Sequence, residues 1–167
     1  FRRVLFRSNA IWAYVRDTGI AVGCKDLGAG GIACATSEIT SASGFGARVI
    51  LDQVNTAVSQ LDPKVIACSE TQERFCLAVP RTHTAAIMAI ANDTYAMGDT
   101  YPQAGAVVIG EVVQAPRYVV EHQGQVVCDL PISIITTDVL VERVAANRTV
   151  ASGQVDRVPS LDANAIA

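Results

Sequence analysis

The amino-acid sequence predicts an α+β fold in which a mixed β-sheet packs against helices. Apolar segments of strand length alternate along the chain with segments whose apolar residues recur at the helical period of about 3.6 residues. Two late strand-like segments are separated by Gln123-Gly124, which is typical of a hairpin and therefore of antiparallel pairing. Half of the 167 residues are hydrophobic and only 17% are charged, so the chain has enough apolar material for a sizeable core.

The first part of the chain is expected to alternate helices with strands. A glycine-rich turn precedes a helix that carries Ile32, Ala35 and Ile39 on one face. This helix is expected to end at Ser43–Gly46. It is preceded by a helix from about Asn9 to Asp17 and a strand from Ile20 to Lys25, and it is followed by a strand from Ala47 to Leu51.

The same alternation is expected to continue after residue 60. Asp62-Pro63 is a strong helix start, because proline suits the first helical position. Thr82 is expected to cap a later helix, and Pro131 to open the last one. The expected elements are a helix to about Ala67, strand Phe75–Val79, a helix from Thr82 to about Tyr95, strand Ala106–Gln114, hairpin strands Tyr118–Glu121 and Gln125–Cys128, and a helix from Pro131 to about Ala145.

These elements predict one folded domain over residues 9–145. Residues 1–8, FRRVLFRS, hold three of the thirteen basic residues and are interpreted as a non-native or disordered leader. From Ala146 onward apolar residues become sparse, so residues 146–167 are expected to form a linker or a frayed tail.

Composition excludes several classes of function. The net charge of −3 and the pI near 5.3 provide no general attraction to nucleic acid. The longest apolar run, Ala85–Ala91, is far shorter than the roughly 18 residues of a membrane span. Five scattered cysteines without C-x-x-C spacing suggest reduced thiols in a cytosolic protein and form no zinc-site pattern.

The first candidate site is Asp26 with the glycine-rich turn Gly28–Gly31, at the junction between a strand and a helix. Glycine lets an anion approach the backbone closely, and helix N-termini favour phosphate. A carboxylate beside such a turn is well placed to bind Mg²⁺ together with phosphate oxygens. The alternative is that Asp26 is only the helix N-cap and that the glycines permit a close crossing of helix and strand.

The second candidate site is the polar segment Ser69–Arg74, which lies between an apolar helix and an apolar strand. It is either an exposed loop or a recognition loop in which Glu70 and Gln72 bind hydroxyl and amide groups of a small polar ligand. Arg74 could instead be an internal partner of Glu70 or Glu73.

The remaining chemically reactive side chains carry no pattern that indicates catalysis. His83 and His122 are expected to be solvated surface residues, and Trp12 to pack in a core or an interface. Cys24 and Cys34 flank the glycine turn, yet a reactive thiol would need a positive setting that only Lys25 suggests. No catalytic residue is assigned within this chain.

Two strings of residues resemble one family. They are Lys25-Asp-Leu-Gly-Ala-Gly-Gly-Ile-Ala-Cys-Ala-Thr-Ser-Glu38 and Cys68-Ser-Glu-Thr-Gln-Glu-Arg-Phe75. In this order and at this separation they resemble the phosphoribosylformylglycinamidine synthases of the large or second-subunit type. The first string is shared across a superfamily of ATP enzymes similar to aminoimidazole-ribonucleotide synthetase. The second string is more particular to the synthase, and Thr71 stands where serine is usual.

The resemblance implies a C-terminal-type synthetase domain and an ATP-dependent amidation in purine biosynthesis. ATP would phosphorylate the amide oxygen of formylglycinamide ribonucleotide, and ammonia from a glutaminase partner would displace phosphate. The resemblance assigns Asp26 as a Mg²⁺ ligand. It assigns Glu70, Thr71 and Gln72 to the ribonucleotide substrate.

The resemblance runs from about Ile11 to Ala145 and implies that the site is completed elsewhere. In this family a preceding domain carries the catalytic histidine and most nucleotide contacts, and a second synthetase-like half follows. The chain alone is therefore expected to be inactive. The alternatives are a sibling ATP enzyme, such as aminoimidazole-ribonucleotide synthetase, or a stand-alone small-molecule-binding or scaffold domain of the same fold.

Overall fold

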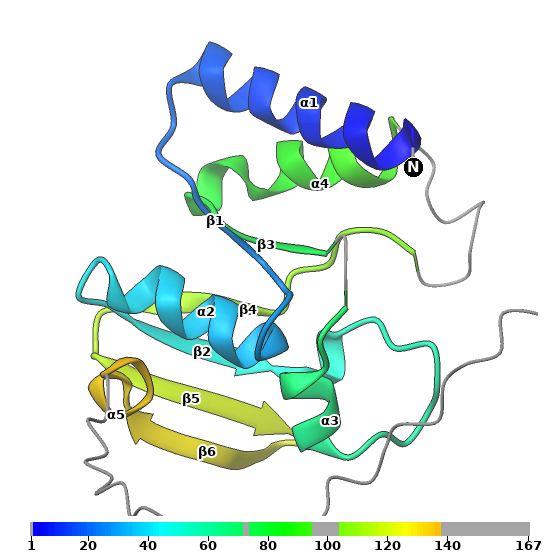
Figure 1. Ribbon diagram of the computed structural model, residues 1–167. Helices are drawn as coiled ribbons and strands as arrows, with labels where there is room; N and C mark the ends of the chain where they lie inside the picture. The colour runs from blue at the N-terminus through cyan, green and yellow to red at the C-terminus, as the bar shows by residue number, and fades with distance from the viewer. Residues whose placement is uncertain (1, 72–73, 95–103, 138–167) are drawn as a thin grey trace, which may run out of the picture. The chain divides into compact units, whose positions relative to one another are not determined.

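A four-stranded mixed sheet forms the base of the fold. In a computed structural model, which describes residues 2–71, 74–94 and 104–137, this sheet has the strand order β4-β2-β5-β6 (Figure 1). Its strands are β2 (Gly46–Ile50), β4 (Gly110–Val113), β5 (Arg117–His122) and β6 (Gln125–Pro131). β2 runs parallel to β5, and the other pairs are antiparallel. The predicted mixed pairing is confirmed.

The predicted hairpin joins β5 to β6. Gln123 and Gly124 have φ values of 51° and 72°, and positive φ at both central residues suits the turn to the twist of the strands. The ladder continues from His122↔Gln125 to Arg117↔Pro131, with an irregularity between Val120 and Glu121.

Helix α2 (Gly31–Ser41) covers one face of this sheet (Figure 1). Ile32 and Ala35 are buried as the helical period predicts, and they join Val49 and Val120 in one core cluster. The Tyr118 hydroxyl lies 2.9 Å from the Thr36 hydroxyl, so the sheet and helix also share a buried hydrogen bond. Short helices α3 (Pro63–Cys68) and α5 (Ile132–Thr136) contact α2 on its flanks.

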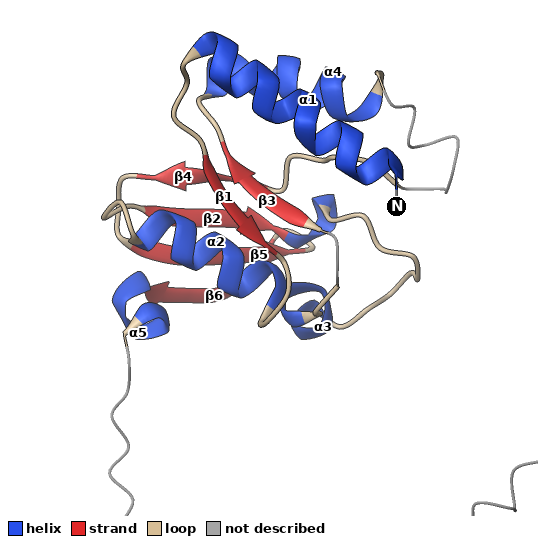
Figure 2. Cartoon of the chain, turned by 45° about the horizontal axis from the view of Figure 1, so that its top comes forward, coloured by secondary structure: helices blue, strands red, loops and turns tan. Residues whose placement is uncertain are grey.

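A second layer consists of a two-stranded antiparallel ribbon and two helices (Figure 2). The ribbon pairs β1 (Gly23–Asp26) with β3 (Phe75–Ala78). Helices α1 (Arg2–Thr18) and α4 (Thr84–Asn92) pack against each other, and the Tyr14 hydroxyl lies 2.8 Å from His83 Nδ1. No helix in the described part of the chain is long and apolar enough to cross a membrane.

Some predicted boundaries were wrong. α1 already begins at Arg2 instead of Asn9, and α4 begins at Thr84, because a 3₁₀ turn over Arg81–His83 precedes it and includes Thr82. The strand predicted from Ala106 to Gln114 is found only over β4; at the start of that segment the Asn92 side chain bonds both the N–H and the C=O of Ala106 at 2.8 and 3.0 Å.

Two helices end before their predicted ends, and the domain division stays a prediction. α5 ends at Thr136, because Thr137 has extended backbone dihedrals, so the helix does not continue unbroken to about Ala145; residues 138–145 lie outside the described residues. α4 ends at Asn92, whereas the predicted end was about Tyr95. The division into residues 1–8, 9–145 and 146–167 stays a prediction.

Candidate functional site

The two sequence motifs lie side by side, although they are 40 residues apart in the chain. The β1–β3 ladder places Asp26 directly opposite Phe75. Beyond the ladder, the Leu27 N–H donates to the Arg74 carbonyl at 2.9 Å, and the Thr71 N–H donates to the Leu27 carbonyl at 3.3 Å. The glycine turn and the polar segment therefore form one continuous hydrogen-bonded unit.

Asp26 closes the first turn of this unit. Its Oδ2 accepts a hydrogen bond from the Gly28 N–H at 3.2 Å, and the residue is exposed. The N-cap of α2 is Gly30, which has φ of 72° and, as a glycine, no side chain with which to cap the helix. The interpretation of Asp26 as the helix N-cap is therefore wrong, and its carboxylate faces solvent at the strand–helix junction.

The close crossing expected at the glycines occurs at Gly31, against a helix rather than a strand. Gly31 has φ of 57°, and a Cβ built there would lie 2.6 Å from the Ser69 carbonyl oxygen and 2.9 Å from the Cys68 carbonyl carbon. The start of α2 thus crosses the end of α3 at backbone contact distance. Only glycine fits both the left-handed conformation and this contact.

Glu70 supplies the cap that Asp26 does not. Its Oε1 accepts a hydrogen bond from the Gly30 N–H at 3.2 Å, so a carboxylate lies at the positive end of the α2 dipole. One N–H at the N-terminus of α2 therefore has an anionic acceptor from within the chain. Thr71 is exposed beside it, and Gln72 lies outside the described residues.

The candidate metal ligand is a single carboxylate. Within the described residues, no group of three or more His, Cys, Asp or Glu side chains could hold a metal ion. Mg²⁺ commonly takes one or two protein carboxylates and completes its shell with phosphate oxygens and water. Exposed Asp26 fits the shared arrangement of protein and phosphate ligands and does not fit an all-protein metal cage.

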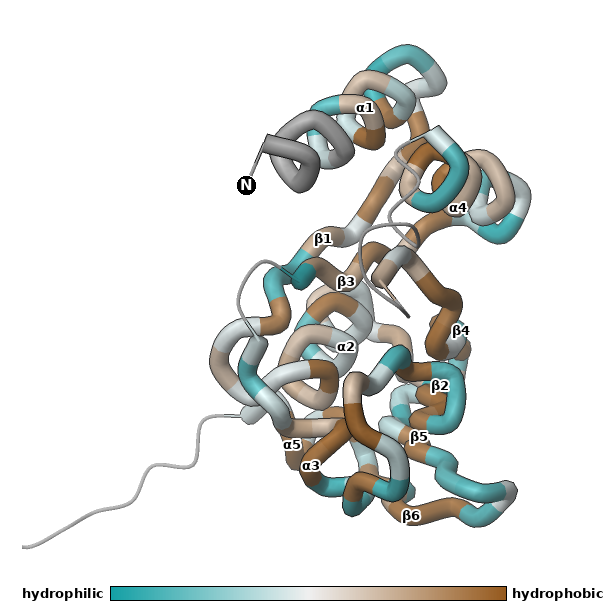
Figure 3. Tube along the Cα trace, turned by 90° about the vertical axis from the view of Figure 1, so that its right-hand side faces the viewer, coloured by the Kyte–Doolittle hydropathy of each residue, from teal (hydrophilic) through white to brown (hydrophobic). Residues whose placement is uncertain are grey.

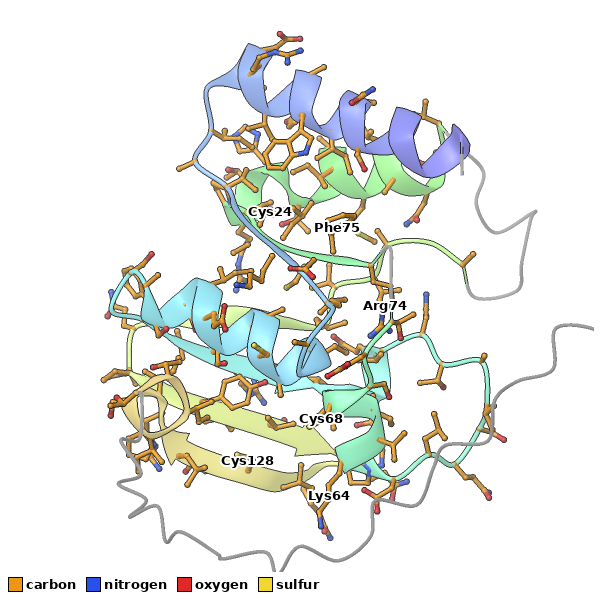
Figure 4. All side chains as sticks on the ribbon, in the orientation of Figure 1. Cys24, Lys64, Cys68, Arg74, Phe75 and Cys128 are labelled. Carbon is orange, nitrogen blue, oxygen red and sulfur yellow. The ribbon has the colours of Figure 1, made fainter. Side chains whose placement is uncertain are left out.

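Arg74 does not pair with Glu70, which accepts a hydrogen bond from Gly30; its other expected partner, Glu73, lies outside the described residues. The Nε and Nη2 atoms of Arg74 are buried and make no hydrogen bond with any residue that the structure describes, and burial lowers the pKa of its guanidinium. Figure 4 shows Arg74 at the start of β3, between the β1–β3 ribbon and α3.

The cysteines near the turn do not have the setting of reactive thiols. The Cys34 Sγ donates to Glu38 Oε1 at 3.0 Å, and Glu38 also pairs with Lys25. The hydrogen bond to the Glu38 carboxylate, followed by burial, raises the pKa of the Cys34 thiol. Lys25 therefore does not supply the positive setting that activation would need.

Both histidines are partly buried, so their interpretation as solvated surface residues was wrong. His83 contacts the Tyr14 hydroxyl, and His122 Nδ1 lies 3.3 Å from Asp52 Oδ1. Asp52 also accepts a hydrogen bond from the Gln123 N–H at 2.8 Å, which ties the hairpin turn to the chain after β2. These contacts join distant segments, and no local pattern in the sequence indicates them.

The chain matches the family model described as AIR synthase related protein, C-terminal domain, over residues 5–123. Among curated relatives it is 39% identical, over 86% of this chain and 19% of the relative, to phosphoribosylformylglycinamidine synthase subunit PurL of Methanothrix thermoacetophila. It is 36% identical, over 71% and 16%, to the same subunit of Thermococcus kodakarensis.

Solved structures of Thermotoga maritima PurL share the fold. The complex with ATP has a TM-score of 0.64 and 27% identity, covering 83% of this chain and 23% of that one. The complex with FGAR has a TM-score of 0.64, 26% identity and coverage of 83% and 22%. A structure of the PurLQS assembly has a TM-score of 0.62, 27% identity and coverage of 83% and 23%.

These matches confirm the resemblance and the α+β fold predicted from the sequence. The chain spans about a fifth of the length of the curated relatives. The family match covers most of the chain, including both motifs of the candidate site. The chain therefore belongs to the family of AIR synthase related proteins, as their C-terminal domain.

Proposed function

We propose that this chain forms part of an ATP-dependent C–N ligase that converts formylglycinamide ribonucleotide and ammonia to formylglycinamidine ribonucleotide in purine biosynthesis. The observation that carries the proposal is the hydrogen bond from Gly30 to Glu70, which joins the glycine turn to the polar segment. The 39% identity to a PurL subunit supports it. Because the chain spans about a fifth of such relatives, the activity belongs to a longer protein or assembly.

The proposed reaction needs phosphate and substrate groups to meet at one place. In the first step the substrate amide oxygen attacks the γ-phosphorus of ATP, and ADP leaves. Ammonia then adds to the activated carbon; the C–O bond breaks, and phosphate leaves with the former amide oxygen. Asp26 would hold Mg²⁺ together with phosphate oxygens, and the ion supplies positive charge that offsets the charge of the phosphates. A glutaminase partner would supply ammonia, and the location would be cytosolic.

Glu70 has a geometry suited to substrate recognition. Its Oε1 is anchored by the Gly30 N–H, so the orientation of the carboxylate is set by the start of α2. No hydrogen bond to the second oxygen, Oε2, is found from the part of the chain that the structure describes, and in this proposal Oε2 accepts one from a substrate hydroxyl. In this proposal Thr71 and Gln72 complete the contacts with the ribonucleotide, and the catalytic histidine comes from a preceding domain.

Substitution of Asp26 tests the metal assignment. In the longer protein that contains this chain, Asp26→Asn should weaken Mg²⁺-dependent formation of the amidine from ammonium chloride, ATP and formylglycinamide ribonucleotide. Asparagine keeps an oxygen that can accept from Gly28, so the turn survives while the negative charge is lost. An unchanged Mg²⁺ dependence would reduce Asp26 to a turn residue. The isolated chain should show no turnover in the same assay.

A further inference from the structure

A large cleft opens beside the candidate site. Its volume is about 1300 Å³, and its walls come from the β1–β3 ribbon, α1, α4 and the β2–β4 edge of the sheet. Most of the wall is apolar; Figure 3 colours the chain just before β4 as hydrophobic, and Val108 and Val112 are exposed. Thr71 and Arg74 of the polar segment lie in the same wall.

The charged residues that the structure describes in this lining are Arg48, Arg74, Arg81 and Glu111. Glu111 pairs with Arg81 at 2.9 Å and lies 3.7 Å from Arg48, which also pairs with Glu121 at 2.9 Å. Arg74 makes no ion pair with any described carboxylate. Among the described residues of the lining, the Arg74 charge is therefore not balanced by an ion pair, although the chain as a whole is acidic.

The position of Arg74 is fixed by its backbone. Its carbonyl accepts the Leu27 N–H at 2.9 Å, at the end of the β1–β3 ladder. Its Nε and Nη2 atoms, which form one edge of the guanidinium, are buried and make no hydrogen bond with described residues. A desolvated guanidinium is costly unless an acceptor meets it, and the lowered pKa of Arg74 has this cause.

We propose that Arg74 is an anion-binding residue of the cleft and that its guanidinium binds a phosphate group of the ligand. The inference rests on the proposed function, which brings phosphorylated molecules to this site. Because the Nε–Nη2 edge is shielded from solvent in this structure, binding requires the guanidinium to turn that edge toward the cleft that Arg74 lines, where it would match two oxygens of one phosphate. A charge-assisted pair of this kind is stronger than a neutral hydrogen bond. The exposed Thr71 in the same wall can donate a further hydrogen bond.

The phosphate could belong to a ribonucleotide or to ATP, so two probes are needed. We would titrate the ¹⁵N-labelled 167-residue chain with ribose 5-phosphate and, separately, with ATP at constant ionic strength, with sodium acetate as the carboxylate probe. The signal is the Nε–Hε resonance of Arg74, identified by its loss in Arg74→Lys. Arg74→Gln removes the charge, and Arg16→Gln is the matched control, since Arg16 is exposed outside the cleft lining.

At least one phosphate probe should shift the Arg74 resonance saturably, and the probe that does so identifies the source of the phosphate. Arg74→Gln should weaken that binding by about tenfold or more, as loss of a charged hydrogen bond implies, whereas Arg16→Gln should leave it within about twofold. The wild-type titration decides the matter even if Arg74→Gln fails to fold.

Three results would overturn the proposal. The first is the absence of a saturable shift with either phosphate probe, and the second is an unchanged affinity in folded Arg74→Gln. The third is an equal shift with acetate, which would make Arg74 a partner for a protein carboxylate. The test is separable from the proposed function. If phosphate binds at Arg74 and the longer protein makes no amidine, only the proposed function fails; if amidine forms with no Arg74-dependent phosphate binding, only this inference fails.

Discussion

Glu70 Oε1 accepts a hydrogen bond from the backbone N–H of Gly30 at 3.2 Å. This contact brings a side chain from the loop after α3 to the N-terminus of α2. It makes Glu70 the cap of a helix that has no local capping side chain, since Gly30 is its N-cap. One carboxylate thus has two roles, one in stability and one, by our proposal, in substrate binding.

The capping role predicts a measurable loss of stability. Glu70→Ala should lower the free energy of unfolding by about 0.5–1 kcal/mol. It removes the acceptor of the Gly30 N–H at the N-cap of α2, and it removes a negative charge from the positive end of the helix dipole. Glu70→Gln should lose less, since it keeps an acceptor oxygen. Urea unfolding of the chain measures both. Equal stability in all three proteins would mean that the contact contributes nothing.

Gly31 and Gly44 provide a matched pair of substitutions. Both have positive φ, 57° and 75°, so alanine at either site should cost about 1–2 kcal/mol. At Gly31 the new Cβ would also meet the Ser69 carbonyl oxygen at 2.6 Å, whereas at Gly44 it meets nothing within 4 Å. Gly31→Ala should therefore lower the free energy of unfolding by roughly 1–3 kcal/mol more than Gly44→Ala does. Similar unfolding midpoints for the two variants would contradict the close crossing of α2 and α3.

The buried core predicts a loss of stability at high pH. Burial raises the pKa of Tyr118 to about 12, from an ordinary value of 10.0. The unfolded phenol loses its proton from pH 10 upward while the folded phenol keeps it. The contribution of Tyr118 is therefore complete below pH 10 and declines as the pH rises toward 12.

Tyr118→Phe tests this origin directly. It should flatten the fall in the free energy of unfolding between pH 10 and 12. Below pH 10 it should also lower stability by roughly 1 kcal/mol, because the hydrogen bond to Thr36 is lost. Cys76, whose pKa burial raises to about 11, would leave part of the decline in place. An unaltered slope in Tyr118→Phe would contradict the assignment.

Local patterns in the sequence predicted the parts of the fold that depend on neighbouring residues. The buried positions Ile32 and Ala35 follow from the helical period. The Asp62 cap also follows from sequence, and its side chain accepts from the Lys64 N–H at 2.8 Å. The hairpin at Gln123-Gly124 is a third example.

Contacts between distant segments could not be predicted in the same way. The cap of α2 is formed by Glu70, 40 residues after Gly30 in the chain. The interpretation of Asp26 as this cap failed because the Asp26 carboxylate accepts a hydrogen bond from the Gly28 N–H instead. β4 is shorter than its apolar run, and the Asn92 side chain binds the Ala106 backbone at the start of that run. These tertiary hydrogen bonds join distant residues, and residue type alone does not reveal their partners.

The most direct test of the proposed function is steady-state kinetics of Glu70→Ala in the longer protein, with ammonium chloride as the ammonia source. If Glu70 binds the ribonucleotide, KM for formylglycinamide ribonucleotide should rise by about tenfold or more, while KM for ATP changes little. Glu70→Gln, which keeps an acceptor, should show a smaller rise. Equal increases in both KM values, or no amidine formed by the wild-type protein, would contradict the account.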